Sequence, residues 1–126
     1  MKVIIAGGRD FTNYALVETA VKLSGFEISQ VVSGKAKGAD TLGEVWALAN
    51  NVTVEAFPAD WNQHGRSAGP IRNRQMAEYA DALIAIWDGE SKGTANMIQQ
   101  ARKLGLDVFI YLVKEANGKE NTSRGW

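Results

Sequence analysis

Two short stretches of the chain combine glycines and cationic side chains at the predicted starts of helices. The first is Ser33-Gly-Lys-Ala-Lys-Gly-Ala-Asp40, and the second is Gly69-Pro-Ile-Arg-Asn-Arg74. The N-terminus of a helix favours an anion, because its first backbone N–H groups are unpaired and the helix dipole is positive there. The pattern therefore indicates a phosphate-bearing ligand such as a nucleotide. It says little about any reaction of that ligand.

Two further stretches have the same character, Gly7-Gly8-Arg9-Asp10-Phe11 and Ser91-Lys92-Gly93-Thr94. A planar guanidinium such as that of Arg9 can bind a phosphate through two parallel hydrogen bonds. The alternative for Arg9 is a salt bridge to Asp10 or Asp40. We expect Gly93 and Thr94 to make a second phosphate contact, and Thr94 can also serve as a helix N-cap.

Several side chains near these stretches are candidates for contacts with the rest of a ligand. The helical spacing places Asn73 inward at the sheet edge, Arg72 at its rim and Arg74 outward. Asp40 either stabilises its helix N-terminus or accepts a hydrogen bond from a ribose hydroxyl. Trp61 is a candidate for stacking on a base, whereas Trp87 fits the core. The predicted ligand-binding residues are Gly7, Gly8, Arg9, Asp10, Ser33, Gly34, Lys35, Gly38, Asp40, Trp61, Arg72, Asn73, Gly93 and Thr94.

We expect neither a metal nor a cofactor. The chain has no cysteine and one histidine, His64, in a predicted loop. A single histidine without an obvious second ligand does not make a zinc site. The absence of cysteine also excludes disulfides and thiol catalysis and fits a cytoplasmic protein.

Strand and helix patterns alternate along the chain. The predicted helices are marked by the apolar spacing of residues 16–24, by residues 39–49, by about ten residues from Pro70, and by Thr94–Leu104. The segment Pro58–Gly69 is predicted to be a polar loop. Continuous apolar runs indicate buried parallel strands, which are expected at Val3–Ala6, Ile28–Ser33, Val52–Phe57, Ala82–Trp87 and Val108–Val113.

This alternation predicts an α/β fold, a Rossmann-like doubly wound parallel sheet of about five strands in the order 3-2-1-4-5. We expect a single domain over residues 1–113 and a polar, mobile tail over residues 114–126. Right-handed crossovers bring every strand-to-helix loop to one edge of such a sheet. Those loops hold more than half of the 13 glycines and half of the 14 Lys and Arg residues, which concentrates positive charge where such folds bind ligands.

The amino-acid composition indicates which classes of partner the protein is expected to bind. A chain of 126 residues with equal numbers of basic and acidic side chains has no overall positive field, so nucleic acid is an unfavoured partner. No apolar run approaches the roughly 20 residues that span a bilayer, so no membrane association is expected. Four tryptophans are many for a chain of this length. We expect a homo-oligomer, because small domains of this class often complete their pocket with a neighbouring subunit.

The glycine-rich motifs, together with Arg72-Asn73-Arg74, make residues 1–113 resemble the SLOG superfamily, and most closely its small YspA/YpsA-related branch from bacteria and phages. The resemblance implies a Rossmannoid fold that binds a nucleotide or a nucleotide-derived ligand across the first, second and fourth strand-end loops. Related groups are the LOG phosphoribohydrolases and the DNA-processing protein that loads single-stranded DNA.

One departure from the LOG pattern concerns catalysis. LOG enzymes resemble one another in a Pro-Gly-Gly-x-Gly-Thr-x-x-Glu segment, and Met97 stands here where that glutamate would be. A thioether cannot act as an acid or base, so either Asp10, Asp40, Asp88 or Glu90 substitutes or the site only binds. The leading hypothesis is a nucleotide-binding sensor, carrier or sequestering protein. The alternatives are an N-glycosidic hydrolase and a single-stranded nucleic-acid binder.

Overall fold

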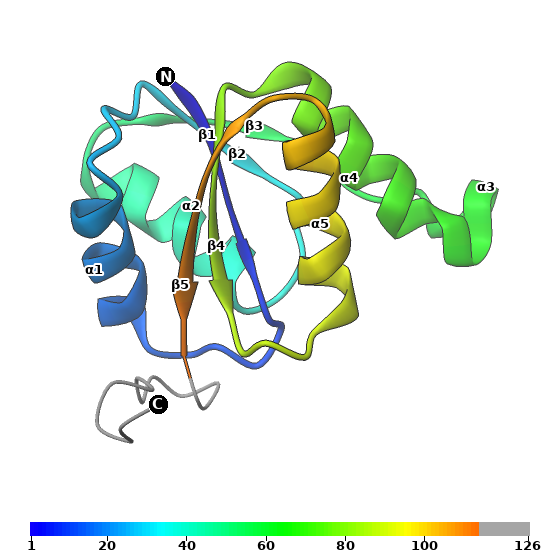
Figure 1. Ribbon diagram of the computed structural model, residues 1–126, viewed down its shortest axis with the longest axis horizontal. Helices are drawn as coiled ribbons and strands as arrows, with labels where there is room; N and C mark the ends of the chain where they lie inside the picture. The colour runs from blue at the N-terminus through cyan, green and yellow to red at the C-terminus, as the bar shows by residue number, and fades with distance from the viewer. Residues whose placement is uncertain (114–126) are drawn as a thin grey trace.

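Five parallel strands form one sheet in the computed structural model, which describes residues 1–113 (Figure 1). The predicted Rossmann-like fold and the strand order 3-2-1-4-5 are confirmed. The predicted tail over residues 114–126 lies outside the described residues. The strands are β1 (Lys2–Gly7), β2 (Gln30–Ser33), β3 (Thr53–Ala56), β4 (Ala82–Trp87) and β5 (Asp107–Leu112).

Helices cover both faces of the sheet (Figure 1). Helices α1 (Tyr14–Ser24) and α2 (Ala39–Ala49) pack on one face, and α4 (Ala68–Tyr79) and α5 (Lys92–Lys103) pack on the other. Alternate residues of each central strand enter the two cores, because successive side chains of a strand point to opposite faces. Among residues 1–113, no helix is long and apolar enough to span a bilayer.

The segment predicted as a polar loop, Pro58–Gly69, is partly helical. It contains the short helix α3 (Trp61–His64) and a 3-10 turn, Gly65–Ser67, and α4 begins at Ala68 rather than at Pro70. The Asp60 side chain accepts a hydrogen bond from the Gln63 backbone N–H at 3.0 Å and so caps α3. This cap is visible in the sequence, but the exposed residues that follow it gave no apolar periodicity to reveal a helix.

Strand order reverses at the centre of the sheet, and this reversal positions the site. The chain runs outward from β1 to β2 and β3, then returns to β4 on the other side of β1. The segments that follow β1 and β4 therefore diverge onto opposite faces and leave a crevice at the carboxyl edge, where ligands bind in folds of this class. The segment after β2 lies at the same edge.

Close packing of α2 on β1 depends on one glycine. A Cβ atom added at Gly43 would lie 2.9 Å from the Cβ and Cγ2 atoms of Ile5. Gly43 and Ile5 are both buried, so neither side has room to yield. This contact fixes the height of α2 above the sheet and with it the position of the helix N-terminus.

We expect Gly43→Ala to destabilise the fold by about 1–3 kcal/mol, because overpacking outweighs the gain in helix propensity of roughly 1 kcal/mol. Gly93→Ala is the matched control, since nothing lies within 4 Å of the Cβ position at this other helical glycine. Urea denaturation of both variants measures the effect. Equal stability of Gly43→Ala and the wild-type protein would show that α2 does not approach β1 this closely.

Candidate functional site

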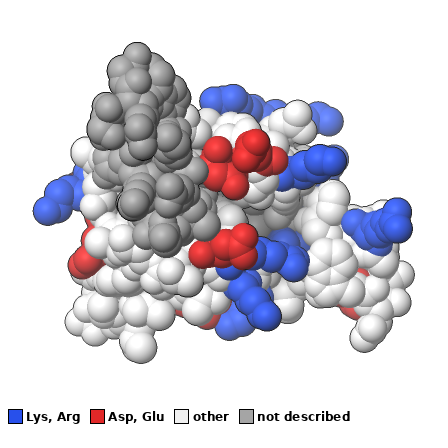
Figure 2. Space-filling view, turned by 90° about the horizontal axis from the view of Figure 1, so that it is seen from below, with Lys and Arg blue, Asp and Glu red and all other residues white. Residues whose placement is uncertain are grey.

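A cavity of 420 Å³ opens at the carboxyl edge of the sheet, above β1 and between α4 and α5. Figure 2 shows this edge as a hollow with Lys and Arg side chains on either side of it. More than half of the predicted ligand-binding residues line the cavity, namely Gly7, Arg9, Asp40, Trp61, Arg72, Asn73, Gly93 and Thr94. The fold thus brings together residues from four separate sequence motifs and from α3.

The floor of the cavity is apolar. It contains Ala6 from β1, Met76 from α4 and Met97 from α5, all of them buried. The sequence patterns marked Ala6 and Met76 as core residues and Met97 as a missing glutamate, but did not indicate that they line a ligand site. Their place at the end of the core, where the sheet edge opens, is decided by the packing of α4 against α5. The remaining unpredicted lining residues are Ala36, Gly69, Pro70, Ser91, Lys92 and Asn96.

The loop after β2 is held between α2 and α4 at Gly34. Its backbone N–H donates to Asp40 Oδ2 at 3.1 Å, and its carbonyl accepts a hydrogen bond from Arg72 Nη1. The Ala36 N–H also donates to Asp40 Oδ2, at 3.4 Å. A Cβ atom at Gly34 would lie 2.6 Å from Arg72 Nη1 and 2.8 Å from Asp40 Oδ2. A side chain at this position would therefore displace the ends of the Arg72 and Asp40 side chains from their contacts with the loop.

These bonds change the expected role of the loop. The sequence prediction assigned the backbone around Ser33, Gly34 and Gly38 to a phosphate. In the structure the Gly34 and Ala36 N–H groups bind Asp40 instead, and the Lys35 N–H donates to Ser33 Oγ at 3.1 Å. Asp40 thus occupies the place that the sequence pattern reserved for a ligand anion.

Burial raises the pKa of Asp40 to about 6. Repulsion by Glu44 acts in the same direction, whereas Arg72 and the backbone hydrogen bonds from Ala36 and Gly34 oppose it. Burial also lowers the pKa of Arg72, with attraction by Asp40 opposing and repulsion by Arg9 adding to the effect. The cavity wall therefore holds a carboxyl group that gains or loses its proton close to neutral pH.

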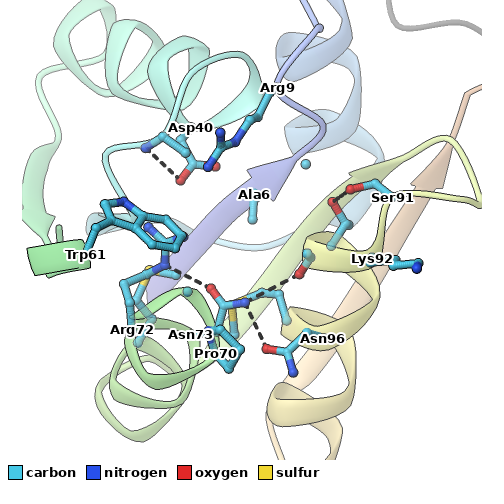
Figure 3. Close-up of a pocket in the computed structure, with 17 residues that line it drawn as sticks. Ala6, Arg9, Asp40, Trp61, Pro70, Arg72, Asn73, Ser91, Lys92 and Asn96 are labelled. Carbon is cyan, nitrogen blue, oxygen red and sulfur yellow. Dashed lines mark hydrogen bonds between the residues drawn. The ribbon is translucent and has the colours of Figure 1, made fainter. Parts of the chain in front are cut away.

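The amide of Asn73 joins α4 to α5. Its Oδ1 accepts from Arg72 Nε at 3.0 Å, and its Nδ2 donates to Asn96 Oδ1 at 3.0 Å and to the Gly93 carbonyl at 3.4 Å (Figure 3). Asn73 faces inward as predicted. Because both ends of its amide are bonded within the protein, Asn73 holds the start of α5 in place and has little capacity left to read a base.

The first turn of α5 carries free hydrogen-bond donors. Thr94 Oγ1 donates to Ser91 Oγ at 3.2 Å, and Ser91, the N-cap residue, makes no side-chain bond to the helix backbone. Within residues 1–113, the backbone N–H groups of Lys92, Gly93 and Thr94 have no hydrogen-bond partner, as expected at a helix start. Lys92 extends its side chain away from the other labelled residues in Figure 3. The N–H groups of this turn are therefore available to an external hydrogen-bond acceptor.

Arg9 lies at the cavity without an ionic partner. No carboxylate in the described part of the chain pairs with it, so the predicted alternative of a salt bridge to Asp10 or Asp40 is wrong for this structure. Asp10 is exposed and does not line the cavity. Arg74, predicted to face outward, is exposed and pairs with Glu78 at 3.3 Å.

The remaining predicted residues support the edge rather than line the cavity. Ser33 is fully buried and donates to Glu44 Oε2 at 2.6 Å, and Lys35 Nζ binds Glu44 Oε1 at 2.9 Å. Gly8 accepts from the Ala39 N–H at 3.2 Å. Gly38 has a φ of 76°, and a Cβ there would lie 2.3 Å from the Gly8 carbonyl oxygen. Gly8 and Gly38 thus allow α2 to start against the segment after β1.

The candidate site contains no evident metal centre. Across residues 1–113, no cluster of three or more His, Cys, Asp or Glu side chains could hold a metal ion. The cavity instead offers backbone donors, two guanidinium groups, a buried carboxyl group and an apolar floor. Such a set is chemically suited to an organic anion.

The raised pKa of Asp40 predicts how stability depends on pH. The folded protein holds this proton more tightly than the unfolded chain, whose carboxyl titrates near 3.8. Stability from Asp40 is therefore complete below pH 3.8 and is lost as the pH rises through about 6. Asp40→Asn retains an acceptor for Gly34, and we expect its stability relative to wild type to improve by up to about 3 kcal/mol between pH 4 and 7. Urea denaturation at several pH values measures this, and parallel pH profiles would contradict it.

Comparison with known proteins agrees with the fold and the motifs. The chain is 40% identical over 87 residues to the Gene 61 protein of Mycobacterium phage D29, a match that covers 64% of this chain and 70% of that protein. The structure of DNA processing protein A (DprA) from Streptococcus pneumoniae superposes with a TM-score of 0.70 at 23% identity, over 86% of this chain. The chain spans about half of DprA, 49%, and this likeness shows the fold alone. The family model of the YspA, cpYpsA-related SLOG family matches residues 1–64, just over half of the sequence. The chain therefore belongs to the YspA, cpYpsA-related SLOG family.

Proposed function

We propose that the cavity binds a nucleotide or a nucleotide-derived ligand with its phosphate at the start of α5. The observation that carries this proposal is the meeting of two unsatisfied groups at one cavity, the free N–H groups of the first α5 turn and the unpaired guanidinium of Arg9. A phosphate oxygen accepts from both. The Gly34 and Ala36 N–H groups of the loop after β2 are not available to it, because both donate to Asp40.

The remainder of the ligand is accommodated by the apolar parts of the cavity. Met76 and Met97 give the floor polarisable sulfur atoms, and Trp61 at the opening is 51% exposed. An exposed tryptophan at the mouth of an apolar cavity is suited to cover a base by stacking. The 420 Å³ volume lies within the range of small-ligand sites and is compatible with one nucleotide.

Binding without chemistry is the leading function. Of the acidic residues that the sequence offered as substitutes for the missing glutamate, only Asp40 lines the cavity, and Asp10, Asp88 and Glu90 do not. Asp40 Oδ2 is bonded to two backbone N–H groups. A sensor, carrier or sequestering protein needs no more than this arrangement.

N-glycosidic hydrolysis is a second candidate because of the buried Asp40 carboxyl on the cavity wall. A proton held close to neutral pH is a property of general acids. Incubation of nucleoside monophosphates with the protein, followed by chromatography for free base, separates the two functions. Base release that Asp40→Asn abolishes would assign the protein to the hydrolases, and intact nucleotide after prolonged incubation supports binding alone.

Net charge, exposed apolar side chains and cysteine content support further proposals on nucleic-acid binding, oligomeric state and cellular location. The neighbour of similar fold is by its name a DNA processing protein, but the zero net charge of this chain disfavours an extended nucleic-acid surface. We propose a homo-oligomer, consistent with exposed apolar side chains at Trp61, Val45 and Leu48. A cytoplasmic location agrees with the lack of cysteine.

Arg9 and Arg74 form a matched pair for testing the phosphate position. Arg9→Ala is expected to weaken the binding of a nucleoside 5′-monophosphate by about 1.5–3 kcal/mol, the range for a hydrogen bond to a charged group. Arg74→Ala removes the same charge from the exposed face of α4, where it pairs with Glu78, and should change the affinity much less. Isothermal titration with the four common ribonucleoside monophosphates measures both. Equal losses in the two variants would place the phosphate elsewhere.

A charge placed at the start of α5 provides a second test. No atom lies within 4 Å of the Cβ position of Gly93, so Gly93→Asp fits without strain and adds a carboxylate that the helix N-terminus itself favours. We expect the fold to keep its stability and nucleotide binding to fall below detection, because the new charge repels the phosphate and competes for the same N–H groups. Gly93→Ala controls for size and should still bind. Unchanged titration of Gly93→Asp would exclude α5 as the phosphate site.

A further inference from the structure

A second, smaller cavity adjoins the candidate site on the side of the β2 loop. Its volume is 260 Å³, and it shares Arg9, Ala36, Trp61 and Arg72 with the larger cavity. Trp61 therefore stands where the two cavities meet, beside Arg72 (Figure 3). A ligand that fills the larger cavity can extend past this tryptophan into the smaller one.

Positively charged side chains line the smaller cavity. Its titratable lining residues are all cationic and come from the loop after β1, the loop after β2 and the first part of α4, namely Arg9, Lys35, Lys37 and Arg72. Glu44 pairs with Lys35 at 2.9 Å and offsets one of these charges. Arg9 and Lys37 have no ionic partner within residues 1–113, and Arg9 repels Arg72.

The backbone at Lys35 adopts an uncommon conformation, and local contacts maintain it. Lys35 has a φ of 61°, a left-handed conformation that is uncommon for a residue other than glycine. The hydrogen bond from its N–H to Ser33 Oγ and the ion pair of its side chain with Glu44 maintain this conformation. The two lysines of the Ser33–Asp40 motif thereby line one cavity, although neither lines the larger one.

We propose that the Arg9, Lys35, Lys37 and Arg72 cluster is a second anion subsite, and that the protein takes a ligand carrying a second phosphate group in addition to the one at α5. This inference rests on the proposed function, since it extends the same ligand. Arg9 and Lys37 gain most from a ligand anion, because they have no ionic partner to lose in the described part of the chain. Lys35 and Arg72 add positive charge while they keep their contacts with Glu44 and Asp40. A nucleoside monophosphate would leave this subsite empty.

The test compares ligands with one and two phosphates. Isothermal titration measures the affinities of adenosine 5′-monophosphate, adenosine 5′-diphosphate and adenosine 3′,5′-bisphosphate at fixed ionic strength. A second phosphate is expected to tighten binding about tenfold or more. Comparison of the diphosphate with the bisphosphate shows where the second phosphate binds. The diphosphate carries it next to the first phosphate at the 5′ position, whereas the bisphosphate carries it on the 3′ oxygen of the ribose.

Lys37→Gln identifies the subsite, because Lys37 lines only the smaller cavity. We expect the ratio of two-phosphate to one-phosphate affinity to fall towards one in this variant. Lys22→Gln, in the last turn of α1, removes an equal charge far from the cavity and should retain the wild-type ratio. Circular dichroism of both variants confirms that the fold is intact.

Each outcome bears on the inference. A wild-type ratio near one, with clear monophosphate binding, overturns the second subsite and leaves the proposed function in place. A raised ratio that Lys37→Gln does not lower places the second phosphate elsewhere and also overturns it. Failure of all three ligands to bind removes the proposed function and this inference together.

Discussion

The contact of Gly34 with Asp40 and Arg72 is the interaction on which the rest of the site depends. One glycine peptide group donates to the carboxylate of α2 and accepts from the guanidinium of α4. Helices on opposite faces of the sheet are thereby connected through the end of β2. Arg72 continues the connection to Asn73, and Asn73 to the start of α5. A displacement of the β2 loop would therefore disturb the contacts of Asp40, Arg72 and Asn73 on the cavity wall.

The glycine-rich motifs after β2 and after β4 are each organised by a carboxylate, Asp40 and Asp88 respectively. Both lie at helix starts and look equivalent in sequence. Asp40 accepts from the Gly34 and Ala36 N–H groups after β2. Asp88 accepts from the Glu90 and Ser91 N–H groups after β4, both at 2.8 Å. Neither α2 nor α5 has a side-chain cap on its own first turn. The start of α5 lines the larger cavity together with Arg9. An unpaired helix start next to an unpaired arginine is suited to an external anion, which is why the proposed phosphate position is at α5. The lysines of the β2 motif remain at the rim, in the smaller cavity.

The chemistry available to the protein is limited by what replaces the glutamate of the related hydrolases. Met97 closes the floor of the cavity with an apolar surface and contributes no proton transfer. The one carboxyl group on the wall, Asp40, is needed to hold the β2 loop. Both backbone hydrogen bonds to this carboxyl group end on Asp40 Oδ2, so a proton on Oδ1 leaves the loop contact intact. Proton transfer by Asp40 is therefore compatible with its role in holding the loop.

The sequence by itself determined the fold and about half of the residues that line the candidate site. Apolar runs alternating with helical spacing specify a parallel sheet and its strand order, because hydrophobic burial and right-handed crossovers leave few alternatives. The same logic brought Arg9, Asn73 and Thr94 to one edge. Tertiary structure alone decided which polar groups remain free, because that depends on partners distant in the chain. Asp40 binding the Gly34 N–H, Asn73 bonding to Asn96, and the exposure of Met97 to the cavity could not be read from local spacing.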